Sequence, residues 1–283
     1  MEKKIKNVTV LGAGNLGSQI AYQIAYRGIS VILYDVNFEA FGKAMEFFPL
    51  LKDMYIKYLD VLPEDLDNTL TNITFSDNLQ EAVSDADLVI ESVPENMEIK
   101  KEVYSQLASF APEKTIFATN SSTFLPTALM SFTGRPDRFL ALHFANMLSR
   151  FNIAEIMGCV KTAPEVYAQM VEFAEEIGMV PIEVKKENSG YVLNALLIPL
   201  LTAASQLLVK GVADIETIDK TWRVSTGAPA GPFQIFDVIG LNTIHNIAKN
   251  GGLNSQYFVR FLEEQYINKG KMGFFSGEGF YKY

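Results

Sequence analysis

The chain has 283 residues, of which 24 are Lys or Arg and 33 are Asp or Glu, so its formal net charge is −9. A chain of this length can form one large domain or two modest ones, each with its own core. The acidic balance argues against a nucleic-acid surface, which requires clustered cations. One Cys and two His exclude a disulfide framework and leave too few ligands for a Cys- or His-rich metal site, so no metal ion is expected.

The first half of the chain alternates short apolar runs with helical patterns. Strands are expected at residues 5–11, 30–34, 73–75, 88–90 and 115–118. Helices are expected at residues 15–27, at 38–58 with an interruption at Pro49, and at 97–110. This alternation predicts a mainly parallel sheet covered by helices on both faces, which is a Rossmann-like, doubly wound α/β fold.

The pattern changes after about residue 185, where strand signals end. Long helices are expected at residues 189–210, 214–224, 232–249 and 254–268. We therefore expect two domains, an α/β domain of residues 1–186 and an all-α C-terminal domain of residues 187–283.

The stretch 189–209 carries no charge and could be interpreted as a transmembrane helix. It contains Asn194, Pro199 and Gln206 and has no strong flanking basic cluster. These features favour a helix buried within the fold or at a subunit interface. We therefore expect no membrane association, and the low cysteine content is typical of a reducing compartment such as the cytoplasm.

A glycine motif follows the first expected strand and opens the first expected helix. Its residues are Gly12, Ala13, Gly14, Asn15, Leu16 and Gly17. In a G-x-G-x-x-G of this context, the first glycine makes the turn, the second lets the backbone approach a pyrophosphate, and the third permits close helix packing. The N-terminus of the helix offers free N–H groups to the phosphates.

Asp35 follows the second expected strand, at the position where a dinucleotide site has its ribose-binding acid. A carboxylate there can accept hydrogen bonds from a ribose 2′-hydroxyl and would repel a 2′-phosphate, which favours NAD over NADP. FAD uses a similar fingerprint, but no other feature of the sequence indicates FAD. The structural alternative is a simple glycine turn followed by a surface Asp.

Two apolar runs, 139–146 and 152–157, are expected to form paired strands with a short connection. If they pair antiparallel about residue 149, His143 and Glu155 lie directly opposite each other on one face. The carboxylate can then hold one ring nitrogen, stabilise the charged ring and leave the other nitrogen for a substrate. A general base that takes a proton from an alcohol as a hydride departs needs this arrangement. A half-buried His with a satisfied carboxylate neighbour is the structural alternative.

The segment 120–123 (Asn-Ser-Ser-Thr) follows the expected strand 115–118 and should lie at the carboxyl end of the sheet, where ligands of open α/β sheets bind. Its side chains could orient a substrate oxygen or the nicotinamide, or they could cap a helix that begins near Thr123. His245 lies in a helical pattern and is expected to be solvated. Cys159 is expected to be structural.

Several motifs spread over the whole chain resemble those of the short-chain L-3-hydroxyacyl-CoA dehydrogenase family, which includes the 3-hydroxybutyryl-CoA dehydrogenases. Besides the glycine motif with Asp35, they are 91–100 (ESVPENMEIK), 120–122 (NSS), 143–146 (HFAN) with Glu155, 189–194 (SGYVLN), 231–233 (GPF) and 277–283 (GEGFYKY). The resemblance implies a helical domain that forms a homodimer and closes over the substrate.

The resemblance also implies an activity and a set of site residues. The activity is the NAD-dependent interconversion of a short-chain (S)-3-hydroxyacyl-CoA, such as 3-hydroxybutyryl-CoA, and the 3-ketoacyl-CoA, a step of fatty acid metabolism. His143 is then the catalytic base, Glu155 its orienting partner, and Ser122, Asn146 and Asn194 are substrate contacts, of which Ser122 and Asn194 also belong to the catalytic set. The expected cofactor-binding residues are Gly12, Gly14, Asn15, Leu16, Gly17, Asp35, Glu95, Lys100 and Asn120.

The sequence departs from the family pattern in the loop after the catalytic His. Ala145 and Met147 stand where the family usually has a second Phe and a Pro, and Arg150 follows where the family is usually apolar. An Arg at this place could bind a substrate carboxylate by a bidentate contact.

A second departure lies in the expected helix 38–58. Leu51 and Tyr58 occupy the positions that usually present Ser and Lys to the adenosine phosphate of CoA. Lys52 and Lys57 lie nearby and are kept as candidate substrate-binding residues.

Three hypotheses follow for the function. The leading one is a 3-hydroxyacyl-CoA dehydrogenase. The alternative is a related dehydrogenase of a free 3-hydroxy acid whose carboxylate is bound by Arg150. The third is a non-catalytic NADH-binding protein, which the complete set of His143, Glu155, Ser122 and Asn194 disfavours because a sensor needs no proton relay.

Overall fold

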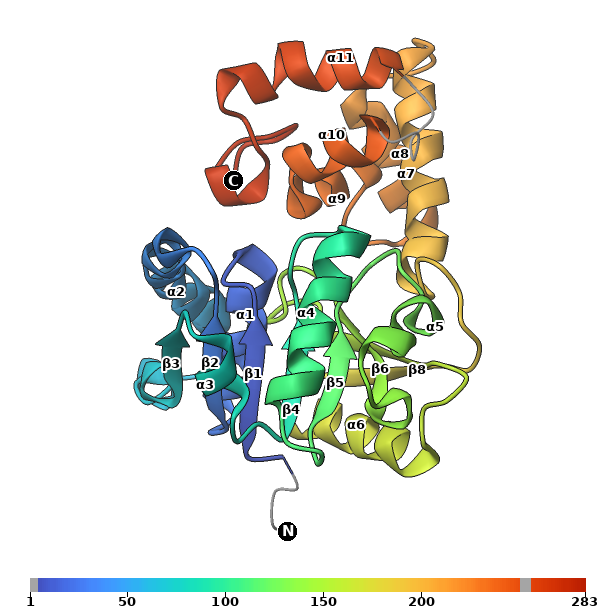
Figure 1. Cartoon of the computed structure of the whole chain (residues 1–283). Helices are drawn as coiled ribbons and strands as arrows, with labels where there is room; N and C mark the ends of the chain where they lie inside the picture. The colour runs from blue at the N-terminus through green and yellow to red at the C-terminus, as the bar shows by residue number, and fades with distance from the viewer. Residues whose placement is uncertain (1–4, 250–255) are drawn as a thin grey trace. The chain divides into compact units, whose positions relative to one another are not determined.

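The computed structural model describes residues 5–249 and 256–283. The chain forms two compact units, Met1–Val192 and Leu193–Tyr283 (Figure 1). Residues 187–192, which the sequence assigns to the helical domain, are part of the first unit.

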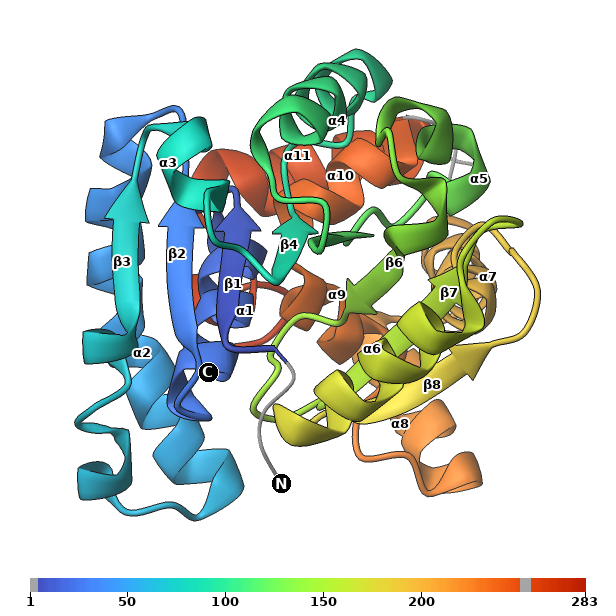
Figure 2. The same cartoon turned by 60° about the horizontal axis from the view of Figure 1, so that its bottom comes forward.

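The first unit is built on an eight-stranded sheet with the strand order β3-β2-β1-β4-β5-β6-β7-β8 (Figure 2). The strands are β1 (Asn7–Leu11), β2 (Ser30–Tyr34), β3 (Ile73–Ser76), β4 (Leu88–Glu91), β5 (Ile116–Thr119), β6 (Phe139–Phe144), β7 (Ile153–Gly158) and β8 (Val180–Val184). All neighbours pair in parallel except β6 and β7, which are antiparallel. The mainly parallel, Rossmann-like sheet is therefore confirmed.

The order of the strands reverses between β1 and β4. From β1 the chain adds β2 and β3 on one side of the sheet, and then returns to add β4 and the later strands on the other side. Both strands at this switch point are buried, because helices cover both faces of the sheet. Loops that leave such a point in opposite directions open a crevice at the carboxyl ends of the strands, where ligands bind.

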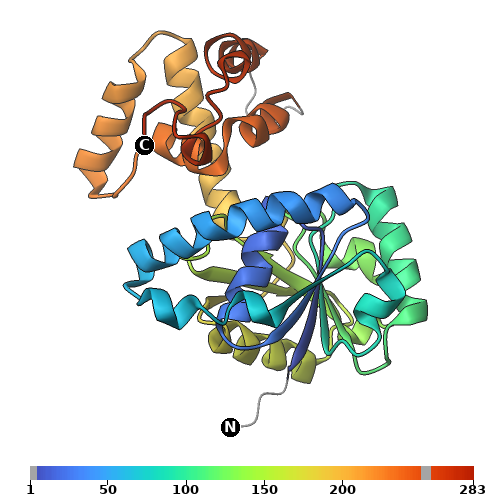
Figure 3. The ribbon, with the colours of Figure 1, turned by 90° about the vertical axis from the view of Figure 1, so that its left-hand side faces the viewer.

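Helices cover both faces of this sheet (Figure 3). They are α1 (Asn15–Tyr26), α2 (Phe38–Leu59), α3 (Leu79–Val83), α4 (Met97–Phe110), α5 (Pro126–Leu129) and α6 (Pro164–Glu176). Helices α1 and α6 lie on one face. On the other face, α3, α4 and α5 pack over the strand residues Leu11, Val89 and Phe117. Short 3-10 helices occur at Pro63–Leu66, Leu70–Asn72, Met130–Phe132 and Pro136–Arg138 in this unit, and at Ile267–Lys269 and Phe274–Ser276 in the second.

Helix α2 continues through Pro49, so the interruption expected there is wrong. A proline inside a helix removes one hydrogen bond and costs about 3 kcal/mol. The helix nevertheless buries Phe48 and Tyr55, whose rings pack against Tyr22 of α1. Burying a large apolar side chain contributes about 1.5–3 kcal/mol each. Asn37 also caps the first turn of the helix.

Helix α6 and strand β8 were not expected from the sequence. Strand β8 pairs in parallel with β7 at the edge of the sheet. It contains Pro181, which weakens the strand signal, but a proline is tolerated on an edge strand because one side of the strand needs no partner.

The second unit is helical, as expected. Its helices are α7 (Leu193–Val209), α8 (Ile215–Thr226), α9 (Pro232–Ile239), α10 (Leu241–Lys249) and α11 (Gln256–Gln265). Phe233, Phe236 and Phe258 form the centre of its core. Within the ranges 5–249 and 256–283, none of the helices is both long enough and apolar enough to cross a bilayer.

Two expected helices of this unit differ in the structure. The helix expected at 232–249 is two helices, because Gly240 between them has a φ of 93° that ends α9. The helix expected from residue 189 begins at Leu193, since Tyr191 has a φ of 54° that no helix residue adopts. Of the helix expected at 254–268, residues 254 and 255 lie outside the described part of the chain.

Two buried carboxylates bind backbone groups of the second unit. Asp219 accepts hydrogen bonds from two N–H groups at the start of α9. Asp237 accepts from Phe280 N at 2.8 Å, Tyr281 N at 2.9 Å and Tyr283 Oη at 2.9 Å, and so holds residues 280–283. Burial raises the pKa of both Asp carboxyls, although these hydrogen bonds oppose the shift.

Candidate active site

The glycine motif forms the turn between β1 and α1. Gly12 has a φ of 102°, and a Cβ on Gly17 would lie 1.9 Å from the Gly12 carbonyl oxygen, so neither position accepts a side chain. A Cβ on Gly14 would meet no atom within 4 Å. Because Gly14 has no side chain, the space beside the first N–H groups of α1, on Asn15 and Leu16, is open. This loop fits the pyrophosphate of a dinucleotide.

Asp35 lies beside the glycine turn. Its Oδ2 accepts a hydrogen bond from Ala13 N at 2.8 Å, and its Oδ1 accepts one from Asn37 N at 2.9 Å. These bonds fix a carboxylate at the end of β2, next to the loop that fits the pyrophosphate. The residues present therefore fit the adenosine half of NAD.

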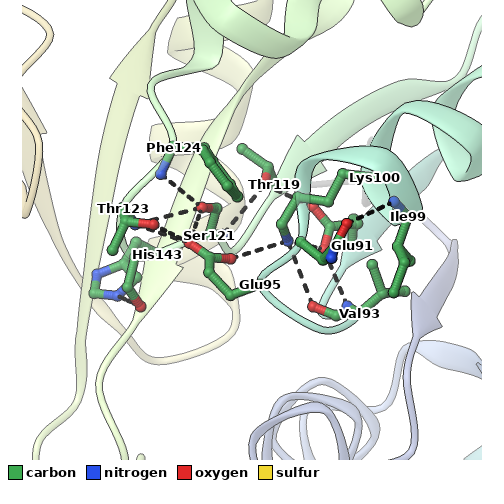
Figure 4. A network of polar contacts seen from close by, with 12 residues as sticks. Glu91, Val93, Glu95, Ile99, Lys100, Thr119, Ser121, Thr123, Phe124 and His143 are labelled. Carbon is green, nitrogen blue, oxygen red and sulfur yellow. Dashed lines mark hydrogen bonds and ion pairs between the residues drawn. The ribbon is translucent and has the colours of Figure 1, made fainter. Parts of the chain in front are cut away.

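A buried ion network lies at the end of β4 (Figure 4). Lys100 of α4 is only 1% exposed, and its Nζ lies 2.6 Å from Glu91 Oε1 and 3.2 Å from Glu95 Oε2. Glu91 has no exposed surface and also accepts from Thr119 Oγ1 at 2.7 Å and Tyr104 Oη at 3.2 Å. A buried carboxylate needs such partners to remain charged. Lys100, expected at the cofactor, is thus enclosed by two carboxylates.

Glu95 connects this network to the segment after β5. Its Oε1 accepts from Ser121 Oγ at 2.5 Å and from Thr123 Oγ1 at 2.6 Å, as Figure 4 shows. Burial alone would raise the pKa of Glu95, but the charge of Lys100 and the hydrogen bonds from Ser121 and Thr123 lower it. The carboxylate therefore fixes the loop that contains Ser122. The capping alternative for this segment is wrong, because α5 begins at Pro126 without a side-chain cap.

His143 and Glu155 are direct partners in the antiparallel pair of β6 and β7, so the expected register is confirmed. His143 Nδ1 lies 2.9 Å from Glu155 Oε2, and His143 Nε2 lies 3.1 Å from Ser122 Oγ. Both ring and carboxylate are buried. Because a carboxylate only accepts hydrogen bonds, Nδ1 carries the proton and the lone pair of Nε2 is directed toward Ser122.

Two neighbours of this pair were not expected as site residues. The ring of Tyr191 stacks on the His143 ring, and Val192 N donates to Glu155 Oε1 at 2.9 Å. Both belong to the motif 189–194, in which only Asn194 was given a role. The motif indicated the segment, but the contacts depend on a backbone turn that sequence does not reveal.

Three Asn residues were expected near the substrate or cofactor. Asn120 Oδ1 accepts from Phe144 N at 2.8 Å and so holds the end of β6 from the neighbouring strand. Asn146 is half-buried and lies two residues beyond β6. Asn194 is the second residue of α7 and belongs to the second unit.

The loop after β6 is held by one side chain of α1. Met147 has a φ of 61°, and its N–H donates to Gln19 Oε1 at 2.8 Å. Leu148 N donates to the same oxygen at 3.4 Å. The altered loop thus has a defined path beside the helix that begins at the glycine motif.

Two matched domains decide the family of this chain. The NAD binding domain of 3-hydroxyacyl-CoA dehydrogenase matches residues 7–188, and the C-terminal domain of 3-hydroxyacyl-CoA dehydrogenase matches residues 190–283. The chain belongs to the 3-hydroxyacyl-CoA dehydrogenase family. It is therefore an NAD-dependent oxidoreductase that acts on CH–OH groups.

Relatives of this dehydrogenase are similar over nearly the whole chain. The human mitochondrial hydroxyacyl-coenzyme A dehydrogenase is 32% identical over 99% of this chain and 91% of its own length. The probable 3-hydroxybutyryl-CoA dehydrogenase of Bacillus subtilis is also 32% identical, over 99% of this chain and 98% of its own length. A solved diketoreductase, described as catalysing reactions of dicarbonyl compounds, is 55% identical, covers 100% of both chains and has a TM-score of 0.90.

The basic residues expected to contact the substrate of the dehydrogenase lie in different surroundings. Lys52 Nζ forms an ion pair with Asp67 at 2.8 Å. Lys57 Nζ and Arg150 Cζ each lie 5.3 Å from the centre of the Tyr58 ring. Lys57 and Arg150 are therefore brought to one aromatic ring, whereas Lys52 is engaged by a carboxylate.

The second His of the dehydrogenase is not solvated, so that expectation is wrong. The His245 side chain is 13% exposed, and its Nε2 lies 2.7 Å from Glu263 Oε1, which joins α10 to α11. Cys159 is a free, buried cysteine. Across the part of the chain that the structure describes, no group of three or more His, Cys, Asp or Glu side chains is arranged to hold a metal ion.

Proposed function

We propose that this dehydrogenase interconverts a 3-hydroxy carbonyl compound and the corresponding 3-oxo compound, with His143 as the general base. The observation that carries the proposal is the line of contacts from Glu155 through His143 to Ser122, which directs the Nε2 lone pair toward Ser122 as the proton acceptor.

In the oxidative direction, His143 Nε2 takes the proton of the C3 hydroxyl group. The glycine loop and Asp35 would hold NAD, which would supply the hydride acceptor for the same carbon. Glu155 keeps Nδ1 protonated and stabilises the positive charge that forms on the ring. Ser122 Oγ, 3.1 Å from Nε2, hydrogen-bonds the reacting oxygen, and Asn146, in the loop after β6, contacts the remainder of the substrate.

We propose further that the preferred substrate is a small dicarbonyl compound or free 3-oxo acid rather than a CoA thioester. Helix α2 supports this, because Leu51 is buried and Tyr58 is covered by Arg150, so neither offers a Ser or Lys to a CoA phosphate. The 55% identical diketoreductase also supports it. The thioester is the alternative, supported by the family and by its 3-hydroxybutyryl-CoA dehydrogenase members.

Arg150 is the candidate for binding a substrate carboxylate. Its guanidinium lies 5.3 Å from the Tyr58 ring centre and 5.1 Å from that of Phe151. Aromatic faces hold a guanidinium in one plane and leave its N–H edge available for a bidentate contact. Of the carboxylates in residues 5–249 and 256–283, none forms an ion pair with Arg150.

A variant of the base tests the catalytic proposal. His143→Gln should lower kcat for NADH-dependent reduction by about 10²–10⁴-fold, since the ring that donates the proton to the carbonyl oxygen in this direction is lost. The Kd for NADH, measured by fluorescence titration, should be unchanged. Loss of NADH binding in this variant would give His143 a structural role instead.

A panel of substrates tests which compound is bound. Acetoacetyl-CoA, free acetoacetate and neutral pentane-2,4-dione are compared at equal concentration with NADH. Arg150→Gln should raise KM at least about tenfold for acetoacetate, because a charged hydrogen bond is lost, and leave KM for the neutral diketone unchanged. Turnover restricted to acetoacetyl-CoA would refute the free-substrate proposal and favour the thioester.

We also propose that the helical unit forms a homodimer. Helix α7 contains no charged residue, yet Leu196 is 72% exposed and Leu207 is 40% exposed. Exposed apolar side chains on an uncharged helix are typical of a surface covered by a second copy. Sedimentation at micromolar concentration should give a dimer, and Leu196→Glu should give a monomer that still binds NADH. A monomeric wild-type protein would refute the proposed homodimer.

We also propose a cytoplasmic location for this dehydrogenase. The free, buried Cys159 supports it.

A further inference from the structure

The turn between β8 and α7 contacts both members of the catalytic pair. Tyr191 has a φ of 54°, an unfavourable conformation for a bulky side chain, and its side chain is 2% exposed. Asn188 supports the turn by accepting from Tyr191 N at 3.0 Å and donating from Nδ2 to Tyr191 O at 2.9 Å. A strained backbone conformation beside the catalytic pair indicates that this turn has a functional role.

The Tyr191 ring fixes the plane of the imidazole. The centres of the Tyr191 and His143 rings lie 4.6 Å apart, and the ring planes differ by 11°. The face of an aromatic ring attracts a cation, so this stack stabilises His143 more when the ring is protonated than when it is neutral. Tyr191 Oη donates to Ser121 O at 2.7 Å, which joins the stacked ring to the residue before Ser122.

The next residue fixes the carboxylate. Val192 N donates to Glu155 Oε1 at 2.9 Å, and Glu155 Oε2 faces His143 Nδ1. One oxygen of the carboxylate is thus occupied by the backbone, and the other is directed to the ring. The positive φ of Tyr191 is what allows consecutive residues to reach the ring and the carboxylate at once.

We propose that the segment 190–192 is a clamp that positions the catalytic pair, with Tyr191 as a positioning residue for His143. The inference rests on the proposed function, because it concerns the same base. Its contribution is to hold Nε2 toward Ser122 and to stabilise the imidazolium that forms during oxidation. The clamp ends directly before Leu193, the first residue of α7.

The groups that face His143 come from three elements. Glu155 lies on β7, Ser122 lies in the loop after β5, and Tyr191 lies in the turn before α7. Burial, followed by the nearby carboxylates of Glu95, Glu155, Glu91 and Glu187, raises the pKa of Tyr191, so its hydroxyl stays protonated and donates. Tyr191 therefore acts through its ring face and its hydrogen bond, and does not itself exchange a proton.

Two variants separate the effect of the aromatic ring of Tyr191 from the effect of the size of its side chain. Tyr191→Phe keeps the ring and loses the hydroxyl, whereas Tyr191→Met keeps a side chain of similar length and loses the aromatic face. The chain has two His, so the NMR signals of the His143 ring are assigned by comparison with His245→Gln. We expect Tyr191→Met to lower kcat by roughly tenfold to a hundredfold with KM unchanged, and to move the His143 ring signals away from their wild-type positions. Tyr191→Phe should keep these signals in place and retain most of kcat.

The controls make each result decisive. Both variants should bind NADH with the wild-type Kd. A Tyr191→Met protein with unchanged His143 ring signals and kcat within about twofold of wild type, or one that no longer binds NADH, would overturn the proposal. If the wild type turns over none of the substrates in the panel, the proposed function fails, but the difference in the His143 ring signals between the two variants still tests the clamp.

Discussion

Replacing Lys100 by Met measures how much the buried ion network contributes to stability. Met has a similar length and retains the packing of the aliphatic chain, so the substitution mainly removes the ammonium group. Glu91, with no exposed surface, then loses a counter-charge at 2.6 Å, and Glu95 loses one at 3.2 Å. Removing one partner of a buried ion pair costs about 3–5 kcal/mol. The free energy of unfolding of a domain is about 5–15 kcal/mol. The variant should therefore still fold but be markedly less stable.

The next residue of α4 offers a matched control. Lys101 pairs with Glu98 at 2.9 Å, but the two side chains are 35% and 81% exposed. Lys101→Met should therefore change the free energy of unfolding by no more than about 1 kcal/mol. Urea unfolding followed by circular dichroism at pH 7 gives both values. A Lys100→Met deficit below about 1 kcal/mol, equal to that of Lys101→Met, would refute the reasoning.

The pH dependence of the Lys100→Met deficit has a definite sign. In the wild type the pKa of Glu95 is lowered, so its contribution to stability is present above the ordinary Glu value of about 4.3 and is lost as the pH falls through the lowered value. In Lys100→Met the charge of Lys100 is gone, so burial favours the protonated form of the Glu95 carboxyl. The deficit should therefore be smaller at pH 4.5 than at pH 7, and a deficit that grows on acidification would contradict this account.

Three further substitutions test other contacts. Glu155→Gln should lower kcat by about 10²–10⁴-fold and shift the pH–rate profile, because the amide NH2 group would replace one acceptor oxygen and face either His143 Nδ1 or Val192 N; an unaltered profile would count against the ion-pair account. Asp35→Ala should weaken NADH binding about tenfold or more and permit NADPH-dependent turnover, which steady-state kinetics with both cofactors would detect. Asp237→Asn should cost about 1–3 kcal/mol, measured by urea unfolding. Since folding raises the pKa of Asp237, its wild-type contribution falls as the pH rises above the ordinary Asp value of about 3.9, so the difference between the two proteins should be larger near pH 4 than at pH 7.

The sequence predicted those features that follow from local pattern. The alternation of apolar runs and helices predicted the parallel sheet, and the glycine motif predicted the turn between β1 and α1. The register of His143 with Glu155 followed from the symmetry of two apolar runs about residue 149, because the side chains of a strand alternate between faces.

Features that depend on tertiary packing were not predictable in the same way. The helix through Pro49 survives because its aromatic face is buried against α1, and the contact of His245 with Glu263 requires two helices to meet. Strand β8 pairs only because an edge position accepts Pro181. The burial of Lys100 between two carboxylates depends on how α4 packs against β4 and β5, which no local pattern specifies.

The contact of Gln19 with the loop after β6 bears on how this enzyme could change its substrate. Gln19 holds the loop through the backbone N–H groups of Met147 and Leu148, which every residue except proline possesses. Ala145 and Arg150 take no part in these two hydrogen bonds, so their side chains are free of this constraint, whereas Met147, with a φ of 61°, and Leu148 are buried. Random replacement at Ala145 and Arg150 therefore leaves the contacts of His143 with Ser122 and Glu155 in place. This separation makes the loop a natural starting point for directed evolution toward other carbonyl compounds.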